Sequence, residues 1–214
     1  MTFPEAATPP ELRIQVRALH EEAWPATPDL PADAPDDSWS PDDSRSADNS
    51  PSPAGSAAYE DGHDPALRPV SMLLVDNDTV LASLDILHLT LVHAGRSYRA
   101  GGLSTVVTRK AARGQGHGRR LVAAAHEAMA ASDLDLGVFT CDRPLQGFYE
   151  SAGWHRLSGT VLIGGTPQAP FPSDQPGFDK ITMADFFSAT ARQTRDAFRH
   201  TRIELYPGEI DRLW

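Results

Sequence analysis

Residues 109–122 read RKAARGQGHGRRLV, and this stretch has the most specific pattern in the sequence. Its three glycines, Gly114, Gly116 and Gly118, alternate with single residues and have arginines beside them. Because glycine has no Cβ, a phosphate group can approach the backbone closely at these positions. The stretch follows a predicted strand ending near Thr108 and opens a predicted helix, whose free N–H groups and dipole favour an anion. It therefore predicts a pyrophosphate cradle, with an ordinary glycine-rich turn as the alternative.

The spacing of the glycines separates this cradle from two other phosphate-binding motifs. A dinucleotide-binding fingerprint, Gly-x-Gly-x-x-Gly, started at Gly114 would place Arg119 at its third glycine. The Gly-Lys-Ser/Thr ending of a nucleoside-triphosphate P-loop is absent from the stretch. The pattern present is Arg-x-x-Gly-x-Gly, formed by Arg113, Gly116 and Gly118. Its arginine can add charge-assisted hydrogen bonds to phosphate oxygens.

The segments around the cradle alternate between helical and strand patterns. Helices are predicted where apolar residues recur every three or four positions, and strands where short apolar runs are bounded by turn residues. The expected order is a helix at 11–24, strands at 69–78, 79–93 and 98–108, a helix at 118–132, a strand at 134–141, a helix at 143–153, strands at 154–165 and 180–186, and a helix at 187–201. The strand at 79–93 is apolar on both faces, so we expect helices on both sides of it. This order predicts an α/β domain with a mixed sheet.

The acidic charge of the chain is concentrated in one segment. The formal net charge of the 214 residues is −10, and the stretch from Ala26 to Pro65 contains ten Asp or Glu and one Arg. This stretch is rich in Pro, Asp and Ser, so it cannot bury enough apolar surface to offset the entropy lost on ordering. We expect a single domain over 1–214, with a flexible acidic insertion at 26–64 and a C-terminal extension at 185–214.

Composition also excludes several classes of protein. The sequence lacks the broad basic surface of a nucleic-acid binder, and no run approaches the roughly 18 apolar residues of a membrane span. The N-terminus lacks the basic and apolar regions of a signal peptide. Cys141 is the only cysteine, so an intramolecular disulfide cannot form. We expect a cytoplasmic protein with no nucleic-acid or membrane partner, in which Cys141 is a free small residue rather than an acyl acceptor.

A second motif follows the cradle about 30 residues later. Residues 145–159 read LQGFYESAGWHRLSG, and the strand predicted at 134–141 lies between the two motifs. Together they resemble the Gcn5-related N-acetyltransferase (GNAT) family, whose acyl-CoA pyrophosphate motif and aromatic-Tyr-x-x-x-Gly-Trp segment have this arrangement. The resemblance covers roughly residues 68–164. It implies the GNAT acyl-CoA N-acyltransferase fold, a mixed central sheet with a splayed strand pair flanked by helices, and acetyl-CoA as the cosubstrate.

The resemblance also implies roles for residues at both motifs. The backbone of the strand before the cradle holds the pantetheine arm, and the cradle holds the pyrophosphate. The residues at these positions are Val106, Val107, Thr108, Arg113, Gly114, Gln115, Gly116, His117, Gly118 and Arg119. Tyr149 matches the general acid that protonates the departing thiolate, with a packed aromatic residue as the alternative, and no metal is expected.

The sequence identifies the general base less clearly than it identifies the general acid. Many relatives carry a Glu on the strand before the cradle, whereas Ser104 stands near that position here. A serine hydroxyl is not a base at neutral pH, so the proton must leave through a water relay or through a carboxylate or imidazole from elsewhere. Asp85 and His88, on the long central strand, are the candidates, with satisfied structural groups as the alternative. Asp85 is the more suggestive, because a buried carboxylate is costly unless it is paired.

The acceptor implied by the sequence is a small cationic amine. Residues 94–116, the run SAGWHRLSG and the acidic C-terminus look like the aminoglycoside 2′-N-acetyltransferases, in which C-terminal residues line the acceptor pocket. Glu209, Asp211 and the carboxylate of Trp214 could bind a polycationic amine here, or form only a solvated tail. Two alternatives remain: a module that holds acyl-CoA without turnover, and transfer to a protein amine recruited by the acidic insertion. A homodimer is compatible with each of these functions.

Overall fold

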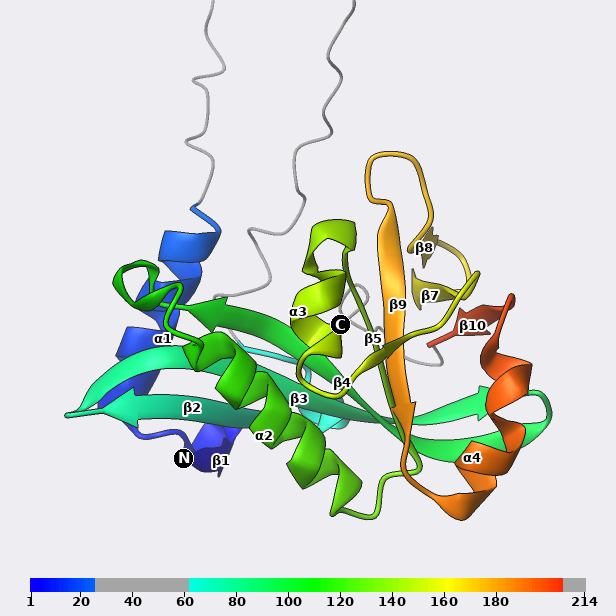
Figure 1. The fold of residues 1–214 in the computed structure, drawn as a ribbon, viewed down its shortest axis with the longest axis horizontal. Coiled ribbons are helices and arrows are strands. Elements are labelled where there is room, and N and C mark those ends of the chain that lie inside the picture. Colours follow the sequence, from blue (N-terminus) through cyan, green and yellow to red (C-terminus); the bar gives the residue numbers. More distant parts are fainter. Residues whose placement is uncertain (26–61, 206–214) are drawn as a thin grey trace, which may run out of the picture.

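A computed structural model describes residues 1–25 and 62–205 of the chain (Figure 1). The described residues form a seven-stranded sheet in the order β1-β2-β3-β4-β5-β9-β6 and a three-stranded sheet in the order β10-β7-β8. The predicted α/β domain with a mixed sheet and flanking helices is confirmed. None of the helices within the described residues is long and apolar enough to cross a membrane.

The centre of the large sheet is an antiparallel meander of the three predicted strands. Its strands are β2 (Val70–Asp76), β3 (Thr79–His93) and β4 (Arg96–Thr108), joined by tight turns. Strand β1 (Thr2–Pro4), which the sequence pattern did not predict, pairs with β2 at the sheet edge. Strand β5 (Leu136–Asp142) runs parallel to β4, and β9 (Lys180–Phe186) runs antiparallel to β5. The sheet is therefore mixed at the β4–β5 pair.

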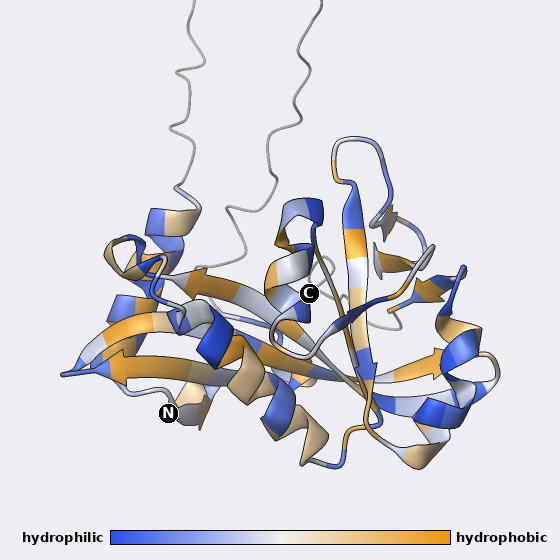
Figure 2. Cartoon of the chain, viewed as in Figure 1, coloured by the Kyte–Doolittle hydropathy of each residue, from blue (hydrophilic) through white to orange (hydrophobic). Residues whose placement is uncertain are grey.

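Two helices cover opposite faces of this meander. Helix α1 (Pro10–Ala23) packs Leu12 and Leu19 against Leu73, Val80 and Val107. Helix α2 (His117–Ala130) packs its buried face against the alternate residues of the same strands, among them Met72, Ala82 and Leu84. Successive strand residues point to opposite faces, so each strand supplies both cores. Figure 2 shows the resulting long hydrophobic stretches of β2 and β3, and alternating hydrophilic and hydrophobic bands along α2.

Strands β4 and β5 are neighbours over a very short distance. They pair only at Ala100 with Leu136 and at Gly101 with Gly137, after which the two strands diverge. A Cβ added at Gly101 would lie 2.6 Å from Met129 Cε, and one at Gly137 would lie 2.5 Å from Trp154 Cζ3. The last pair therefore consists of two glycines because core side chains fill the space above them. Beyond it, the β5-facing edge of β4 has no strand partner among the described residues.

The region after the second motif differs from the sequence prediction. The prediction of a single strand at 154–165 is wrong. The chain instead forms two strands, β6 (His155–Arg156) and β7 (Val161–Gly165), which belong to different sheets. Between them Gly159 adopts a φ of +68°, and a Cβ there would lie 2.3 Å from His200 Nδ1. The left-handed backbone of Gly159, packed closely against His200, interrupts the strand. The periodicity of apolar residues in the sequence does not indicate this interruption.

Much of the predicted C-terminal extension is packed into the domain. It contains α4 (Ala189–Thr194), the 3-10 helix η5 (Arg195–Phe198) and β10 (Arg202–Glu204). The helix predicted at 187–201 is thus shorter than expected and ends in a 3-10 turn. Strand β10 runs parallel to β7, which also pairs with β8 (Pro170–Pro172). Phe198 and Ile203 are fully buried in the core that this small sheet shares with β3 and β5.

Candidate active site

One pocket lies where α2 begins, beside the end of β4 and the short helix α3 (Gln146–Glu150). Its volume is about 630 Å³. Nine of the residues predicted to hold the cosubstrate line it: Val106, Val107, Thr108, Arg113, Gly114, Gly116, His117, Gly118 and Arg119. Gln115 is exposed and does not line it, although its Oε1 lies 3.3 Å from His117 Nε2. We call this the cradle pocket. Binding of the cosubstrate by these residues stays a prediction.

The start of α2 leaves backbone donors facing the cradle pocket. Gly116 occupies the cap position with a φ of +80°, and Gly114 has a φ of +77°, so both need the conformation that glycine adopts most easily. A Cβ added at either residue would meet no atom within 4 Å. No side chain caps the first N–H groups of α2. Open space, free donors and the positive end of the helix dipole together suit a phosphate group.

Gly118 has a different function from the two glycines before it. A Cβ at this buried residue would lie 2.6 Å from Thr108 Oγ1 and 3.5 Å from the ring of Phe148. Its missing side chain therefore lets the first turn of α2 pack directly on β4 and α3. Arg113 lines the same pocket, and its Nε donates to the Thr108 carbonyl at 3.1 Å. The glycine pattern thus sets both the opening of the pocket and the position of the helix.

Tyr149 lies on α3 at the wall of the cradle pocket. It is buried, and its ring packs edge-on to Phe139 at a centroid distance of 4.9 Å. Burial, followed by the neighbouring Cys141 and Asp142, raises the pKa of the phenol well above its usual value. The hydroxyl is protonated at neutral pH, and the raised pKa makes it a weaker acid than an exposed phenol. Cys141 is also buried, and burial raises the pKa of its thiol to about 11, so it is a neutral thiol rather than a nucleophile.

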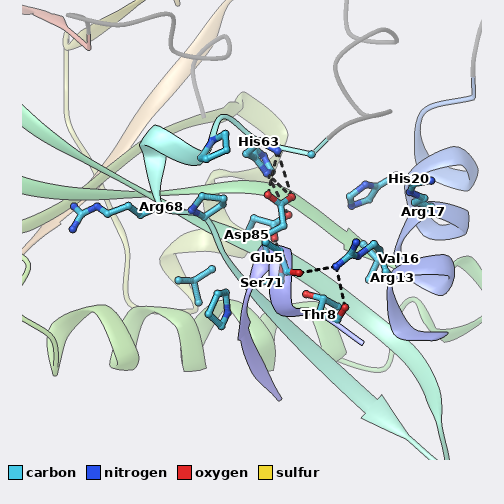
Figure 3. A pocket seen from close by; sticks show the side chains of 16 residues that line it. Glu5, Thr8, Arg13, Val16, Arg17, His20, His63, Arg68, Ser71 and Asp85 are labelled. Atoms are coloured by element: carbon cyan, nitrogen blue, oxygen red, sulfur yellow. Dashed lines mark hydrogen bonds and ion pairs between the residues drawn. The ribbon is translucent and has the colours of Figure 1, made fainter. Parts of the chain in front are cut away.

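A second pocket opens on the α1 face of the same strands (Figure 3). Its volume is about 640 Å³. Glu5, His63 and Asp85 point toward one another on one side of it, and side chains of α1 lie on the other (Figure 3). We call this the carboxylate pocket. Ala23, the last residue of α1, lines the cradle pocket, and Val16 and Arg17 in the middle of the helix line the carboxylate pocket, so α1 runs past both.

An irregularity in β4 lies between the two pockets. Val107 pairs with Ser83 and Ser104 with Asp85, so Thr105 and Val106 together oppose one residue of β3. Thr105 takes a φ of +50°, which a β-branched residue rarely adopts. This is a β-bulge, which changes the direction in which side chains point. As a result Ser104 and Thr105 both point toward the α1 face, where the carboxylate pocket lies.

Asp85 is held at the base of the carboxylate pocket. It is 5% exposed, and its two oxygens accept separate hydrogen bonds from Ser71 Oγ at 2.5 Å and Thr105 Oγ1 at 2.6 Å. The nearest ring nitrogen of His63 lies 4.0 Å from it. Two hydroxyl donors and a nearby imidazole are the pairing that a buried carboxylate needs. The predicted candidate Asp85 therefore lies in a pocket, while its role in a reaction stays a prediction.

His63 brings the carboxylate pocket into contact with Ser104. Its Nε2 lies 3.1 Å from Ser104 Oγ, and its Nδ1 lies 3.1 Å from Glu5 Oε1. The backbone N–H of His63 also donates to both carboxylate oxygens of Glu5, at 3.4 and 3.1 Å. Burial alone would raise the pKa of Glu5, but the hydrogen bond and charge of His63 hold it below its usual value.

The sequence did not indicate either His63 or Glu5. His63 falls in the predicted flexible insertion, whose last three residues, 62–64, are described and ordered against Glu5. Glu5 lies in a Pro- and Ala-rich N-terminal stretch without a motif. The donor atoms of Glu5, His63 and Asp85 lie within 4.8 Å of one another, which is close enough for one metal ion. The hydrogen bonds between Glu5 and His63, and those that Asp85 accepts from Ser71 and Thr105, account for the same arrangement. The expectation of no metal stays a prediction.

The other predicted residues are not part of these pockets. His88 lines neither pocket, and its Nδ1 lies 3.0 Å from the Arg68 carbonyl. Burial lowers the pKa of His88, so it has the features of a satisfied structural group. Glu209, Asp211 and Trp214 lie outside the described residues.

Comparisons with known proteins show the family to which the chain belongs. The diverging pair of β4 and β5 and the α2 N-terminus open to a pocket are the features that the resemblance to the GNAT family implied. Residues 15–157 match the family model described as an acetyltransferase (GNAT) domain. The chain therefore belongs to the GNAT acetyltransferase family, whose members are acyltransferases that use acyl-CoA. A search of curated protein sequences returned no significant match.

Solved structures share the fold at low sequence identity. The chain is 16% identical to ElaA from Escherichia coli, with a TM-score of 0.53, 86% of this chain covered and 96% of that chain. An acyl-CoA N-acyltransferase from Pseudomonas aeruginosa is 17% identical, with a TM-score of 0.51 and the same coverage of 86% and 96%. An aminoglycoside 6′-N-acetyltransferase complexed with coenzyme A is 13% identical, with a TM-score of 0.49, 88% of this chain covered and 97% of that chain. These similarities do not bear on the acceptor.

Proposed function

We propose that this protein transfers the acetyl group of acetyl-CoA directly to a primary amine of a small cationic acceptor. The observation that carries the proposal is the position of the two pockets on either side of the β4 bulge. One pocket presents a helix N-terminus suited to phosphate, and the other presents the carboxylates of Glu5 and Asp85. A thioester and an amine bound in them would meet near Ser104 and Val106.

The cradle pocket would hold acetyl-CoA. The N–H groups at the start of α2, with Arg113 and Arg119, would bind the pyrophosphate. The unpaired edge of β4 beyond Gly101 would donate and accept hydrogen bonds along the pantetheine arm, as an added strand would. Open space at Gly114 and Gly116 supports this assignment, because a phosphate needs that space.

Direct transfer requires three things of the site. The acceptor ammonium must lose a proton, the thioester carbonyl must be attacked to form a tetrahedral intermediate, and the sulfur must be protonated as it leaves. Tyr149 is placed for the last step, because it lines the cradle pocket and its phenol is protonated at neutral pH. Burial raises its pKa and makes it a weaker acid, so the proton transfer depends on the charge that develops on the sulfur as it leaves. The acetyl group then passes from sulfur to nitrogen without a covalent enzyme intermediate.

A small cationic acceptor fits the carboxylate pocket. Glu5 and Asp85 favour an ammonium group there, and Arg13, Arg17 and Arg68 line the same pocket. This mixture suits an acceptor that carries hydroxyl or anionic groups as well as an amine, such as an aminoglycoside or an amino-acid derivative. Glu209, Asp211 and Trp214 would add negative charge, as the resemblance to aminoglycoside 2′-N-acetyltransferases implies.

One observation favours a second function, a module that holds acyl-CoA without turnover. Ser104 stands where many relatives have a glutamate base, and a serine cannot replace its chemistry alone. The two functions differ in one measurable quantity, which is the release of coenzyme A when an amine is present.

The test measures acetyl-CoA turnover against a panel of aminoglycosides, polyamines and amino-acid amides, with acetyl-CoA binding titrated in parallel. We expect release of free thiol with one class of amine, and a matching gain of one acetyl group on that amine by mass spectrometry. Tight acetyl-CoA binding without thiol release across the panel would contradict the proposed transfer and support the binding module.

A further inference from the structure

We infer that His63 is the general base for the acceptor amine and that Ser104 carries the proton to it, with Glu5 as the residue that positions the imidazole. This inference rests on the proposed function, amine acetylation in the carboxylate pocket. It identifies the general base, which the sequence did not reveal because Ser104 stands where many relatives have a glutamate. This base, His63, is 41 residues before Ser104 in the sequence and lies near the end of the acidic insertion at 26–64.

The hydrogen bonds of His63 select one tautomer of its ring. An ionised carboxylate only accepts hydrogen bonds, so the contact of 3.1 Å between Nδ1 and Glu5 Oε1 places the ring proton on Nδ1. Nε2 then has a lone pair, and it lies 3.1 Å from Ser104 Oγ, which can donate. The basic nitrogen of His63 is therefore directed at Ser104, on the strand that also lines the cradle pocket.

The surroundings of His63 would stabilise the imidazolium that forms. Glu5 binds both its ring and its backbone N–H, so the carboxylate is fixed in position. Asp85 lies 4.0 Å from Nδ1 and is held in turn by Ser71 and Thr105. The remaining charged or titratable groups that line this pocket are His20, Arg13, Arg17 and Arg68. Two fixed carboxylates beside a nearly buried ring favour its protonated form during the reaction.

Ser104 lies where the acceptor and the thioester would meet. It comes three residues after Gly101, where β4 leaves β5, and directly before the bulge residue Thr105. The bulge is what allows Ser104 and Thr105 to face the same side, so that one contacts His63 and the other Asp85. A regular strand would turn Thr105 away and leave Asp85 with one hydroxyl donor fewer.

The proton transfer can be written with all atoms balanced. The acceptor N–H bond breaks as its proton passes to Ser104 Oγ, and the original Ser104 O–H bond breaks as that proton passes to His63 Nε2. The ammonium becomes a neutral amine with a free electron pair, Ser104 is again a hydroxyl, and His63 becomes an imidazolium beside Glu5. The amine electron pair then attacks the thioester carbonyl, and the C–S bond breaks as the tetrahedral intermediate collapses and Tyr149 gives its proton to the leaving sulfur. The acylated nitrogen loses its second proton to solvent as the amide forms, and the Tyr149 phenolate takes a proton back from solvent, so the one net proton released is the one that His63 carries.

The same three side chains resemble the arrangement of a hydrolytic triad, in which the serine would become acylated. The two uses of Ser104 give different products, and mass spectrometry of the protein incubated with acetyl-CoA separates them. We expect the intact mass to stay unchanged, because a relay leaves Ser104 unmodified. An acetyl group found on Ser104 would overturn the relay.

The kinetic test compares His63→Gln with His88→Gln, a matched change at a histidine outside both pockets. We expect His63→Gln to lower kcat at least about 100-fold, which is the range of general base catalysis, and His88→Gln to leave it within about threefold. Acetyl-CoA affinity should stay close to wild type in both variants, and both should be fully folded at the assay temperature by circular dichroism, although loss of the Glu5–His63 contact lowers the melting temperature of His63→Gln. These two controls distinguish loss of the base from loss of the fold.

Two further variants test the relay and the positioning carboxylate. Ser104→Ala should lower kcat at least about tenfold, and Ser104→Thr should recover part of the loss, because it restores a hydroxyl. Glu5→Gln should move the acid limb of the kcat/KM profile to lower pH, because loss of the anion lowers the pKa of the imidazole. A purely structural Glu5 would change stability without moving that limb.

Failure of this inference differs from failure of the proposed function. If the wild-type protein releases coenzyme A with an amine and His63→Gln does so at a similar rate, only the relay is overturned. If the wild-type protein releases none with any amine, the proposed function fails and the relay fails with it. A ¹⁵N spectrum of the wild-type imidazole adds a readout without turnover, since the relay requires the proton on Nδ1 at neutral pH, and a proton on Nε2 would contradict it.

Discussion

At the scale of single residues, burial sets the chemistry of both pockets. Tyr149 and Cys141 are buried close together, and burial raises the pKa of each, so both stay protonated at neutral pH. Asp85 and Glu5 are carboxylates whose oxygens are occupied by hydroxyl, imidazole and backbone donors. The site therefore combines a neutral proton donor near the cradle with anions on the opposite face of β4.

Removal of the Tyr149 hydroxyl tests whether this residue donates the proton to the leaving sulfur. Tyr149→Phe keeps the ring and its contact with Phe139, so we expect the fold and the acetyl-CoA affinity to be retained. We expect kcat to fall at least tenfold, which corresponds to about 1.4 kcal/mol of transition-state stabilisation. Steady-state kinetics with parallel titration of acetyl-CoA measure both quantities, and an unchanged kcat would remove Tyr149 from the reaction.

The stability of the protein should depend on Glu5 in one pH range. Its pKa is lowered from the usual 4.5 on folding, so its contribution is present above about pH 4.5 and is lost as the pH falls below that value. We expect Glu5→Gln to destabilise the protein at about pH 6, with a smaller difference from wild type below pH 4.5. Urea denaturation at both pH values measures this. Glu11→Gln, at an exposed position of α1, is the control, and an equal loss from Glu5→Gln at both pH values would contradict the prediction.

At the scale of elements, the strand-to-helix connection from β4 to α2 is the feature that the sequence predicted best. Its glycines, the end of β4 at Thr108 and the start of α2 at His117 were all expected within a residue or two. Local patterns suffice here, because the signal depends on neighbours in the chain. The bulge at Thr105 and the break between β6 and β7 were not expected, because each depends on contacts with distant segments.

A pair of glycine variants isolates the phosphate site from backbone strain. Gly116 and Gly95 both have a positive φ, of +80° and +73°, and neither has an atom within 4 Å of an added Cβ. Gly116→Asp adds negative charge where phosphate should bind, so we expect at least a 100-fold loss of acetyl-CoA affinity. Gly95→Asp, in the hairpin turn between β3 and β4, should cost similar strain and leave affinity unchanged. Calorimetric titration measures both, and equal affinities would contradict the phosphate site.

At the scale of the whole molecule, the site joins segments that are far apart in the chain. Glu5, His63 and Ser104 come from three separate segments, with contacts spanning 58 and 41 residues. Sequence reasoning found Ser104 and Asp85 through the strands that hold them. It missed His63, because the Pro- and Asp-rich composition of the preceding segment predicts flexibility and gives no information on where that segment returns to the domain.

The acidic segment can be tested without changing its length, which matters because His63 follows it directly. We expect turnover of a small amine to stay within about threefold when seven of the nine aspartates at 26–64 are changed to asparagine, since the carboxylates proposed to bind the amine are Glu5 and Asp85. The positions to change are Asp29, Asp33, Asp36, Asp37, Asp42, Asp43 and Asp48. A loss of more than tenfold in kcat/KM, with kcat unchanged, would show instead that the segment recruits the acceptor.

The most direct test of the central claim maps coenzyme A onto the protein by amide NMR titration. We expect chemical-shift changes concentrated at Thr108 and at residues 113–119, with smaller changes along β4 toward Ser104. The small sheet of β7, β8 and β10 should stay unchanged. Changes confined to that sheet, or to the carboxylate pocket, would contradict the assignment of the α2 N-terminus as the acyl-CoA site, and the division of the two substrates between the pockets would fail with it.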